Sequence, residues 1–165
     1  MHQTGQGPGQ VDATTGLGRF RVTDLVSLHL AEDRPGAVIL RRQLLEMVGE
    51  DDAIVGVFNI GAIVRGLFKS AYLGYYALAP HAGAGYMAEG LELALRVAFR
   101  RLKLHRVEAN VQPDNRRSLA LVRRAGFVRE GFSRRYVRIG GRWRDHVRMA
   151  LLVEDWRARR TRARP

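Results

Sequence analysis

A short glycine loop followed by a helical pattern is the first candidate for chemistry in this sequence. Gly83, Ala84 and Gly85 separate an aromatic-rich, uncharged run (residues 71–78) from a segment in which apolar residues recur at helical spacing (residues 87–102). Glycine lets a backbone approach a ligand closely, and the free N–H groups and dipole of a helix start attract anions, above all phosphate. A tight turn without a ligand is the alternative, and a lone glycine motif does not decide between the two.

A second candidate segment follows this helix. Residues 107–112 alternate apolar and polar side chains, which is the pattern of a strand with one buried face. Asp114 or Asn115 then caps a second helix. Ser118 lies on the apolar face of that helix, and Gly126 ends it. The sequence therefore predicts strand, glycine loop, helix, strand and helix, in that order.

This order of motifs resembles the GNAT superfamily of N-acetyltransferases. Two sets of residues, beginning at His105 and at Gly141, resemble the Rim-type branch, which acetylates the N-terminal amines of ribosomal proteins. The resemblance covers about residues 44–152 and implies an α/β fold: a mixed, mostly antiparallel sheet with flanking helices, splayed central strands and a C-terminal hairpin. The residues that carry it are Leu73-Gly74-Tyr75, Gly83-Ala84-Gly85-Tyr86-Met87-Ala88-Glu89, Leu104-His105-Arg106-Val107-Glu108-Ala109, Asn115, Ser118 and Ala125-Gly126-Phe127.

The resemblance implies that acetyl-CoA is the co-substrate. Backbone N–H groups of the glycine loop would hold the pyrophosphate, and the end of the preceding strand would guide the pantetheine arm. A backbone N–H near Leu78 would face the developing oxyanion. Ala82 and Met87 stand where the superfamily usually has Arg or Gln and Gly or Ala, so one side-chain contact is missing. The residues assigned to the coenzyme are Tyr76, Ala77, Leu78, Gly83, Ala84, Gly85, Tyr86, Met87 and Asn115.

The transfer also needs a proton donor for the leaving thiolate and a proton acceptor for the amine. Ser118 matches the serine to which the Rim-type branch assigns the first role; the alternative is a small residue packed on the helix. Glu108 is the candidate base, since carboxylates beside a desolvated cleft become better proton acceptors; the alternative is an ion pair with an arginine. Glu130 is a second candidate base. No metal and no protein nucleophile are required, because the amine attacks the thioester directly. Four further residues are interpreted as structural or pocket-shaping: His105, His146, Tyr75 and Trp143.

Composition limits the class of protein. The 165 residues suit one domain that buries about two-thirds of its unfolded surface. The chain has no cysteine, which excludes disulfides and thiolate zinc sites. It has no apolar run of the roughly 18 residues that a membrane helix needs and no signal sequence at its start, so a cytoplasmic protein is expected. The net charge of +12, almost all from arginine, attracts polyanions such as coenzyme A phosphates, ribosomal RNA or simple counter-ions.

The expected organisation is a flexible N-terminal tail (residues 1–18), a single acetyltransferase domain (residues 19–156) and a basic C-terminal tail (residues 157–165). Gly140 and Gly141 predict a two-residue hairpin turn between strands at 136–139 and 143–151. The resemblance implies two acceptor-pocket helices near the start, for which residues 23–36 are too few. The other predicted elements are strands at 19–22, 37–40, 44–48 and 53–59, a short helix capped by Asp24, a turn at 49–52 and a connection at 61–70.

Two functions of different class follow. The first is an N-acetyltransferase that moves an acetyl group from acetyl-CoA to a primary amine, with a protein N-terminus as the expected acceptor and no membrane partner. The second is a non-catalytic module of the same fold that binds RNA or the ribosome through basic surface, because a fold does not guarantee chemistry. The glycine loop with Asn115 and Ser118 favours the first function, and the shortened N-terminal region favours the second. The five arginines between residues 157 and 164 are the predicted site of any RNA contact.

Overall fold

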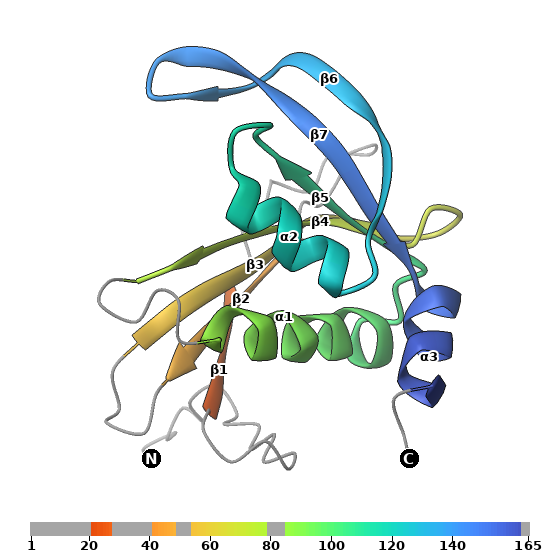
Figure 1. The fold of residues 1–165 in the computed structure, drawn as a ribbon. Helices are drawn as coiled ribbons and strands as arrows, with labels where there is room; N and C mark the ends of the chain where they lie inside the picture. Colours follow the sequence, from red (N-terminus) through yellow and green to blue (C-terminus); the bar gives the residue numbers. More distant parts are fainter. Residues whose placement is uncertain (1–20, 28–40, 49–53, 79–84, 163–165) are drawn as a thin grey trace, which may run out of the picture.

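The computed structural model describes residues 21–27, 41–48, 54–78 and 85–162, and within them one sheet is flanked by helices (Figure 1). Seven strands follow the order β1-β2-β3-β4-β5-β7-β6. The elements are β1 (Arg21–Ser27), β2 (Arg41–Val48), β3 (Ile54–Val64), β4 (Ser70–Ala77), α1 (Tyr86–Arg96), the π-helical turn η1 (Val97–Arg101), β5 (Arg106–Val111), α2 (Arg116–Arg124), β6 (Val128–Ile139), β7 (Arg142–Leu152) and α3 (Val153–Arg162).

The centre of the sheet is where its pairing changes. All neighbouring strands are antiparallel except β4 and β5, which run parallel and pair only from Ser70↔Arg106 to Tyr72↔Glu108. Beyond that register β4 stays paired with β3 while β5 stays paired with β7, so the two central strands diverge (Figure 1). The mixed, mostly antiparallel sheet with splayed central strands and a C-terminal hairpin is thus confirmed.

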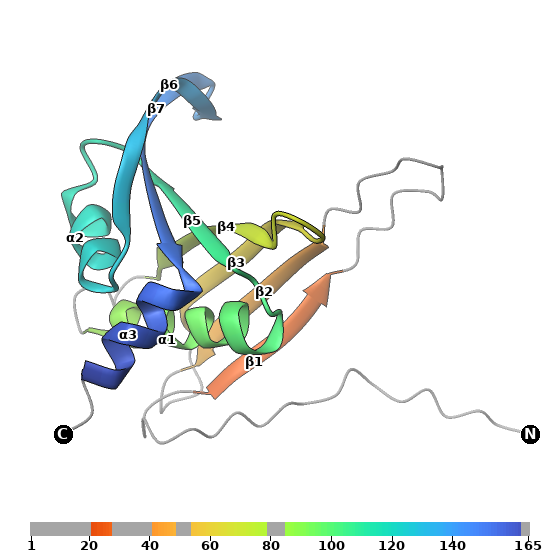
Figure 2. The same cartoon turned by 90° about the vertical axis from the view of Figure 1, so that its right-hand side faces the viewer.

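The hydrophobic core lies between the sheet and the two helices that cover one of its faces, as the two ribbon views agree (Figures 1 and 2). The helical spacing predicted after the glycine loop is confirmed, because the apolar stripe of α1 is buried. In β5 every second side chain is buried, as the predicted alternation requires. The buried side chains of these elements include Leu91, Ala94, Leu95, Ala98, Val107, Ala109, Val111, Val122, Met149 and Leu151.

Two predicted elements at the front of the domain are wrong. Asp24 does not cap a helix, since residues 21–27 form β1 and pair along their whole length with β2. The connection expected at 61–70 begins later, because β3 continues to Val64 through a bulge in which Ala62 has a φ of 48°. Both differences come from pairing with distant strands, which overrides local preference. The predicted N-terminal tail, the strand at 37–40 and the turn at 49–52 lie outside the described residues.

The C-terminal hairpin predicted around Gly140 and Gly141 is confirmed. Gly140 and Gly141 form its turn with φ values of 57° and 77°, as the two-residue glycine turn requires. The first strand starts already at Val128, so β6 and β7 have 12 and 11 residues. Their turn end projects away from the helices (Figures 1 and 2).

The basic C-terminal segment is helical over most of its described length. Trp156 of α3 is 2% exposed and packs on Phe99 with ring centroids 5.3 Å apart. Arg159 and Arg160 both bind Glu92 of α1 at 2.7 Å. Two of the five arginines predicted to meet RNA therefore hold α3 against α1. No helix in the described ranges combines the length and hydrophobicity needed to cross a bilayer.

Candidate functional site

The start of α1 has the backbone geometry that the glycine loop predicted. Gly85 precedes the helix with a φ of 87°, a left-handed conformation that side chains rarely adopt. A Cβ placed on Gly85 would meet no atom within 4 Å among the described residues. The N–H of Ala88 donates to the Gly85 carbonyl at 2.9 Å, and the positive end of the helix dipole lies at this end of α1. Gly83 and Ala84 lie outside the described residues.

The side chain of Met87 turns away from this opening and packs on β3. A Cβ added to Gly56 would lie 2.8 Å from the Met87 sulfur, so the absence of a side chain at Gly56 makes room for the long side chain of Met87. Where the superfamily usually has Gly or Ala, this chain has Met87, and its side chain packs between α1 and β3. The Met87 backbone remains in the first turn of α1, where the sequence assigned it.

The end of β4 presents its backbone in two directions. The N–H of Leu78 donates to Val55 of β3 at 3.0 Å, so this group is already used. Because hydrogen-bonding direction alternates along an antiparallel pair, Tyr76 also pairs with β3, whereas the N–H and C=O groups of Tyr75 and Ala77 point toward the diverging β5. The Leu78 N–H, near which an oxyanion donor was predicted, is therefore used within the sheet, and the Ala77 N–H is the neighbouring donor directed toward β5. The Tyr76 side chain is 57% exposed on the face away from the core.

A hydroxyl pair bridges β4 and α2. Asn115 caps α2 by accepting the Ser118 N–H at 3.0 Å, which confirms the predicted cap. The Ser118 Oγ lies 2.5 Å from the Tyr75 hydroxyl. Tyr75, in turn, stacks on Phe58 of β3 with ring centroids 5.6 Å apart. Sequence reasoning treated Tyr75 as a pocket-shaping residue, since nothing in local spacing pairs it with a serine 43 positions away.

Burial raises the pKa of Tyr75, although the hydrogen bond with Ser118 acts in the opposite direction. The phenol therefore stays protonated at neutral pH. The two hydroxyl groups carry one exchangeable proton each, and one of these protons lies in the short hydrogen bond between them. Such a pair can deliver a proton from Ser118 Oγ and have it replaced from Tyr75.

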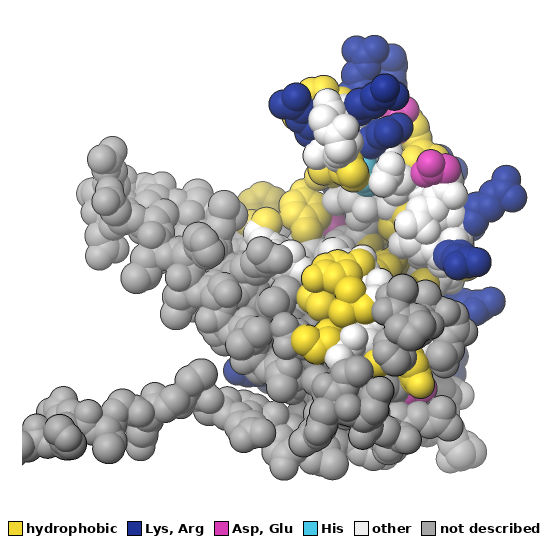
Figure 3. Space-filling model, turned by 90° about the vertical axis from the view of Figure 1, so that its left-hand side faces the viewer, with side chains coloured by type: hydrophobic (Ala, Val, Ile, Leu, Met, Phe, Trp, Pro, Cys, Tyr) yellow, Lys and Arg dark blue, Asp and Glu magenta, His cyan; other side chains and the backbone are white. Residues whose placement is uncertain are grey.

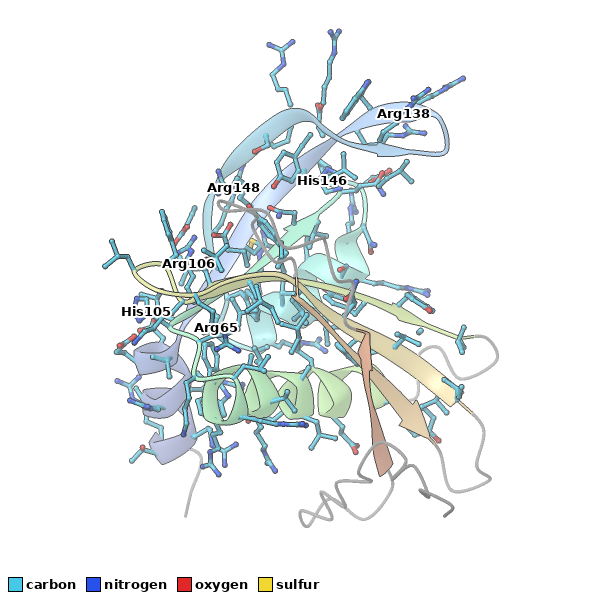
Figure 4. The ribbon with its side chains drawn as sticks, turned by 180° about the vertical axis from the view of Figure 1, so that it is seen from behind. Arg65, His105, Arg106, Arg138, His146 and Arg148 are labelled. Carbon is cyan, nitrogen blue, oxygen red and sulfur yellow. The ribbon has the colours of Figure 1, made fainter. Side chains whose placement is uncertain are left out.

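Glu108 lies on the opposite face of the sheet, between Arg106 and Arg148; Figure 4 labels these two arginines. Its Oε1 accepts from Arg106 Nε at 2.9 Å and its Oε2 from Arg148 Nη2 at 3.2 Å. The side chain is 14% exposed. The structure thus shows the ion-pair alternative: each carboxylate oxygen of Glu108 accepts a charge-assisted hydrogen bond from an arginine.

Glu130 is held by the same arginine. Arg106 Nη1 donates to Glu130 Oε1 at 2.9 Å, and Arg106 Nη2 donates to the other oxygen. These hydrogen bonds lower the pKa of Glu130 below its ordinary value, which is the wrong direction for a base. Arg106, Glu108, Glu130 and Arg148 therefore form one ion-pair network across β5, β6 and β7.

Asn110 is a residue of this face that sequence reasoning missed. It follows Glu108 by two positions on β5 and pairs with Arg148 of β7, just beyond the point where β4 pairing ends. Its Oδ1 is buried and has no hydrogen-bond partner among the described residues. A buried, unused acceptor at a strand divergence suits a ligand N–H. The signal available in the sequence was its place on the same polar face as Glu108.

The other residues of this face are already engaged with one another. A side-chain hydrogen bond with Tyr136, together with burial, raises the pKa of Tyr72 to about 12, so a tyrosine pair connects β4 to β6. His146 is buried, lies edge-on to Tyr136 at 5.8 Å, and its Nδ1 is 3.0 Å from the Arg144 carbonyl. These contacts agree with the structural role predicted for His146.

A cavity of about 980 Å³ opens elsewhere, between α1, η1, α2 and α3. Glu92 and the arginines of α3 line it, whereas Tyr75, Glu108 and Ser118 do not. Its walls carry the Glu92 ion pairs that attach α3 to α1. Size alone therefore does not identify the site; the chemical groups converge where β4 and β5 diverge.

Comparison with known proteins finds relatives of one family. The model of the acetyltransferase (GNAT) domain matches residues 19–128. The [ribosomal protein uS5]-alanine N-acetyltransferase of Escherichia coli is 43% identical over 107 residues, which are 65% of this chain and 55% of that protein.

Two solved structures share the fold. Ribosomal-protein-S5-alanine acetyltransferase from Vibrio fischeri is 28% identical with a TM-score of 0.66, covering 70% of this chain and 63% of that one. Mycobacterium smegmatis RimJ in complex with CoA-disulfide is 37% identical with a TM-score of 0.62, covering 67% and 54%. The chain spans a little over half the length of the curated relatives it matches first.

Proposed function

Since this chain belongs to the GNAT acetyltransferase family, we propose that it transfers an acetyl group from acetyl-CoA to a primary amine, and that this amine is the N-terminus of a protein. The observation that carries the proposal is the Ser118–Tyr75 hydroxyl pair, 2.5 Å long, which joins α2 to β4 beside the diverging strands. A proton donor at this place serves a leaving thiolate, which is the chemistry that acyl transfer from a thioester needs.

The described residues fit the coenzyme. The left-handed glycine at the start of α1 and the positive end of the helix dipole suit a pyrophosphate, and the Tyr75 and Ala77 backbone groups suit the amides of an extended arm. When bound, acetyl-CoA supplies an acetyl group activated as a thioester. A coenzyme A derivative bound to the M. smegmatis relative supports this assignment.

The opposite face suits the amine. The unused Oδ1 of Asn110 can accept an N–H from it and so orient it toward the gap between β4 and β5. To act as the base, Glu108 must release one of its two arginines and accept the amine in its place. Without that exchange, water takes the proton of the amine. The Ala77 N–H is directed to the same gap and can donate to a carbonyl oxygen there.

A protein N-terminus is the proposed acceptor because two relatives are named for acetylating an alanine of a ribosomal protein. The experiment uses the full chain, acetyl-CoA and peptides that begin with alanine, serine or methionine. Mass spectrometry locates any acetyl group on the α-amine, and release of the coenzyme thiol gives the rate. A peptide with a blocked N-terminus and one internal lysine is the control. Acetylation of the lysine alone, or of no peptide, would contradict the proposal.

Asn115 allows the cap and the coenzyme contact to be separated. We expect Asn115→Asp to keep the melting temperature, because a carboxylate accepts the Ser118 N–H as well as the amide does. The same variant loses an amide donor and gains a charge, so its affinity for acetyl-CoA falls several-fold. Asn115→Ala is the matched control: it loses the cap and about 1 kcal/mol of stability. Unchanged affinity for acetyl-CoA in Asn115→Asp would contradict the coenzyme contact and show that Asn115 only caps α2.

A further inference from the structure

The turn end of the C-terminal hairpin concentrates positive charge. Residues 134–144, called the hairpin tip below, contain five arginines and no acidic residue. All five are exposed. Figure 3 shows Lys and Arg side chains gathered at the upper end of the molecule, where the hairpin projects. The tip arginines are Arg134, Arg135, Arg138, Arg142 and Arg144.

These charges are not neutralised within the part of the chain that the structure describes. Some arginines on the body of the fold bind carboxylates: Arg106 and Arg148 bind Glu108, and Arg159 binds Glu92. No such ion pair involves a tip arginine in the described ranges. The nearest acid in sequence, Asp145, accepts the Arg135 backbone N–H at 2.7 Å and so maintains the bulge in β6.

The tip also separates its charges in a regular way. Each paired position sets one arginine against one apolar residue across the two strands. This arrangement avoids placing like charges directly opposite one another. It also presents cations beside apolar surface on a two-stranded ribbon. The pairs are Val137↔Arg144, Arg138↔Trp143 and Ile139↔Arg142.

Trp143 gives the tip an aromatic surface. It is 60% exposed, although its large ring would gain from burial. Directly opposed residues of an antiparallel pair share one face, so the Trp143 ring lies on the same face as the Arg138 guanidinium. An exposed ring beside a cation is the combination that binds an unstacked base together with its phosphate.

We infer that the hairpin tip binds single-stranded RNA. The tip arginines, which form no ion pair with a described carboxylate, supply sequence-independent attraction to phosphates. Trp143 supplies a stacking platform, which a base in a regular duplex cannot use. The inference does not depend on acetyl transfer, since no tip residue belongs to the site between β4 and β5. It also moves the RNA contact from the C-terminal segment, where the sequence predicted it, to the hairpin.

The test measures fluorescence anisotropy of a labelled oligouridylate of about 12 nucleotides, between about 50 and 200 mM salt. We expect the triple variant R138A/R142A/R144A to reduce the slope of log affinity against log salt by about 2. W143A should weaken binding about 10-fold with little change in slope. Binding should also quench Trp143 emission, whereas the buried Trp156 stays unaffected.

Two controls separate the tip from general basic charge. R123A/R157A/R162A removes the same charge from exposed positions of α2 and α3 and should keep the affinity within about two-fold. R138K/R142K/R144K should keep the salt slope. All variants should melt near the parent temperature, because the changed side chains are exposed.

Three outcomes would overturn the inference. One is equal weakening by both alanine triple variants; another is full RNA affinity in the tip variants. The third is tip-dependent binding to vesicles of phosphatidylglycerol and phosphatidylcholine, or to a polyglutamate peptide, with no binding to the oligouridylate. Acetyl-transfer assays on the same variants keep this result distinct from failure of the proposed enzymatic function.

Discussion

Replacing Ser118 with alanine is expected to lower kcat for acetyl transfer by about 100-fold, the lower end of the usual effect of a general acid. The Ser118 hydroxyl is the group on α2 that shares a hydrogen with Tyr75, so its removal leaves the leaving thiolate without that donor. The affinity for acetyl-CoA, measured by titration calorimetry, should change little. Asn115 retains its place as cap because it accepts from the Ser118 backbone rather than from the side chain.

Tyr75→Phe is the matched variant for the other half of the hydroxyl pair. It keeps the ring that stacks on Phe58 and removes only the hydroxyl, so the fold should persist. We expect a smaller loss of kcat than in Ser118→Ala, since Ser118 keeps its own proton. An acetyl thioester whose thiol is strongly acidic should reduce the penalty of both variants, because a stable thiolate needs no acid. Equal kcat values in parent and Ser118→Ala would remove the proton-donor role.

A negative charge at the start of α1 should abolish coenzyme binding. Gly85→Asp is expected to weaken affinity for acetyl-CoA about 100-fold or more, since a carboxylate about 5 Å from a pyrophosphate charge costs about 3 kcal/mol at an effective dielectric of 20. Among the described residues, no atom lies within 4 Å of a Cβ placed on Gly85. Ligand at 100 times Kd stabilises the folded protein by about 2.7 kcal/mol. The thermal shift that reports this stabilisation should therefore nearly disappear in Gly85→Asp.

Gly85→Asn controls for backbone strain. Asparagine and aspartate have nearly the same shape and both tolerate the left-handed conformation that Gly85 adopts, with a φ of 87°. The two variants should lose similar stability without ligand. Only Gly85→Asp should lose the thermal shift. If both variants keep the shift, the coenzyme does not bind at this helix start.

Features determined by neighbouring residues could be predicted from the sequence alone. Gly85 and the Gly140–Gly141 turn need positive φ, which glycine adopts without strain. Asn115 caps α2 through a bond to a residue three positions away. Burial along α1 and β5 follows from periods of 3.6 and 2 residues. The order of these local elements was enough to indicate the family and the helix start that would hold the coenzyme.

Only the tertiary structure decided which distant groups meet. Ser118 finds Tyr75 across 43 positions, Glu108 finds Arg148 across 40, and the Leu78 N–H is taken by Val55. None of these pairs can be predicted from the spacing of nearby residues, because each depends on strand order and register, and on where β4 and β5 diverge. The same holds for β1, whose pairing with β2 replaced the helix that Asp24 predicted. Sequence periodicity tells which face of an element is buried, whereas long-range packing decides what each buried or exposed group contacts.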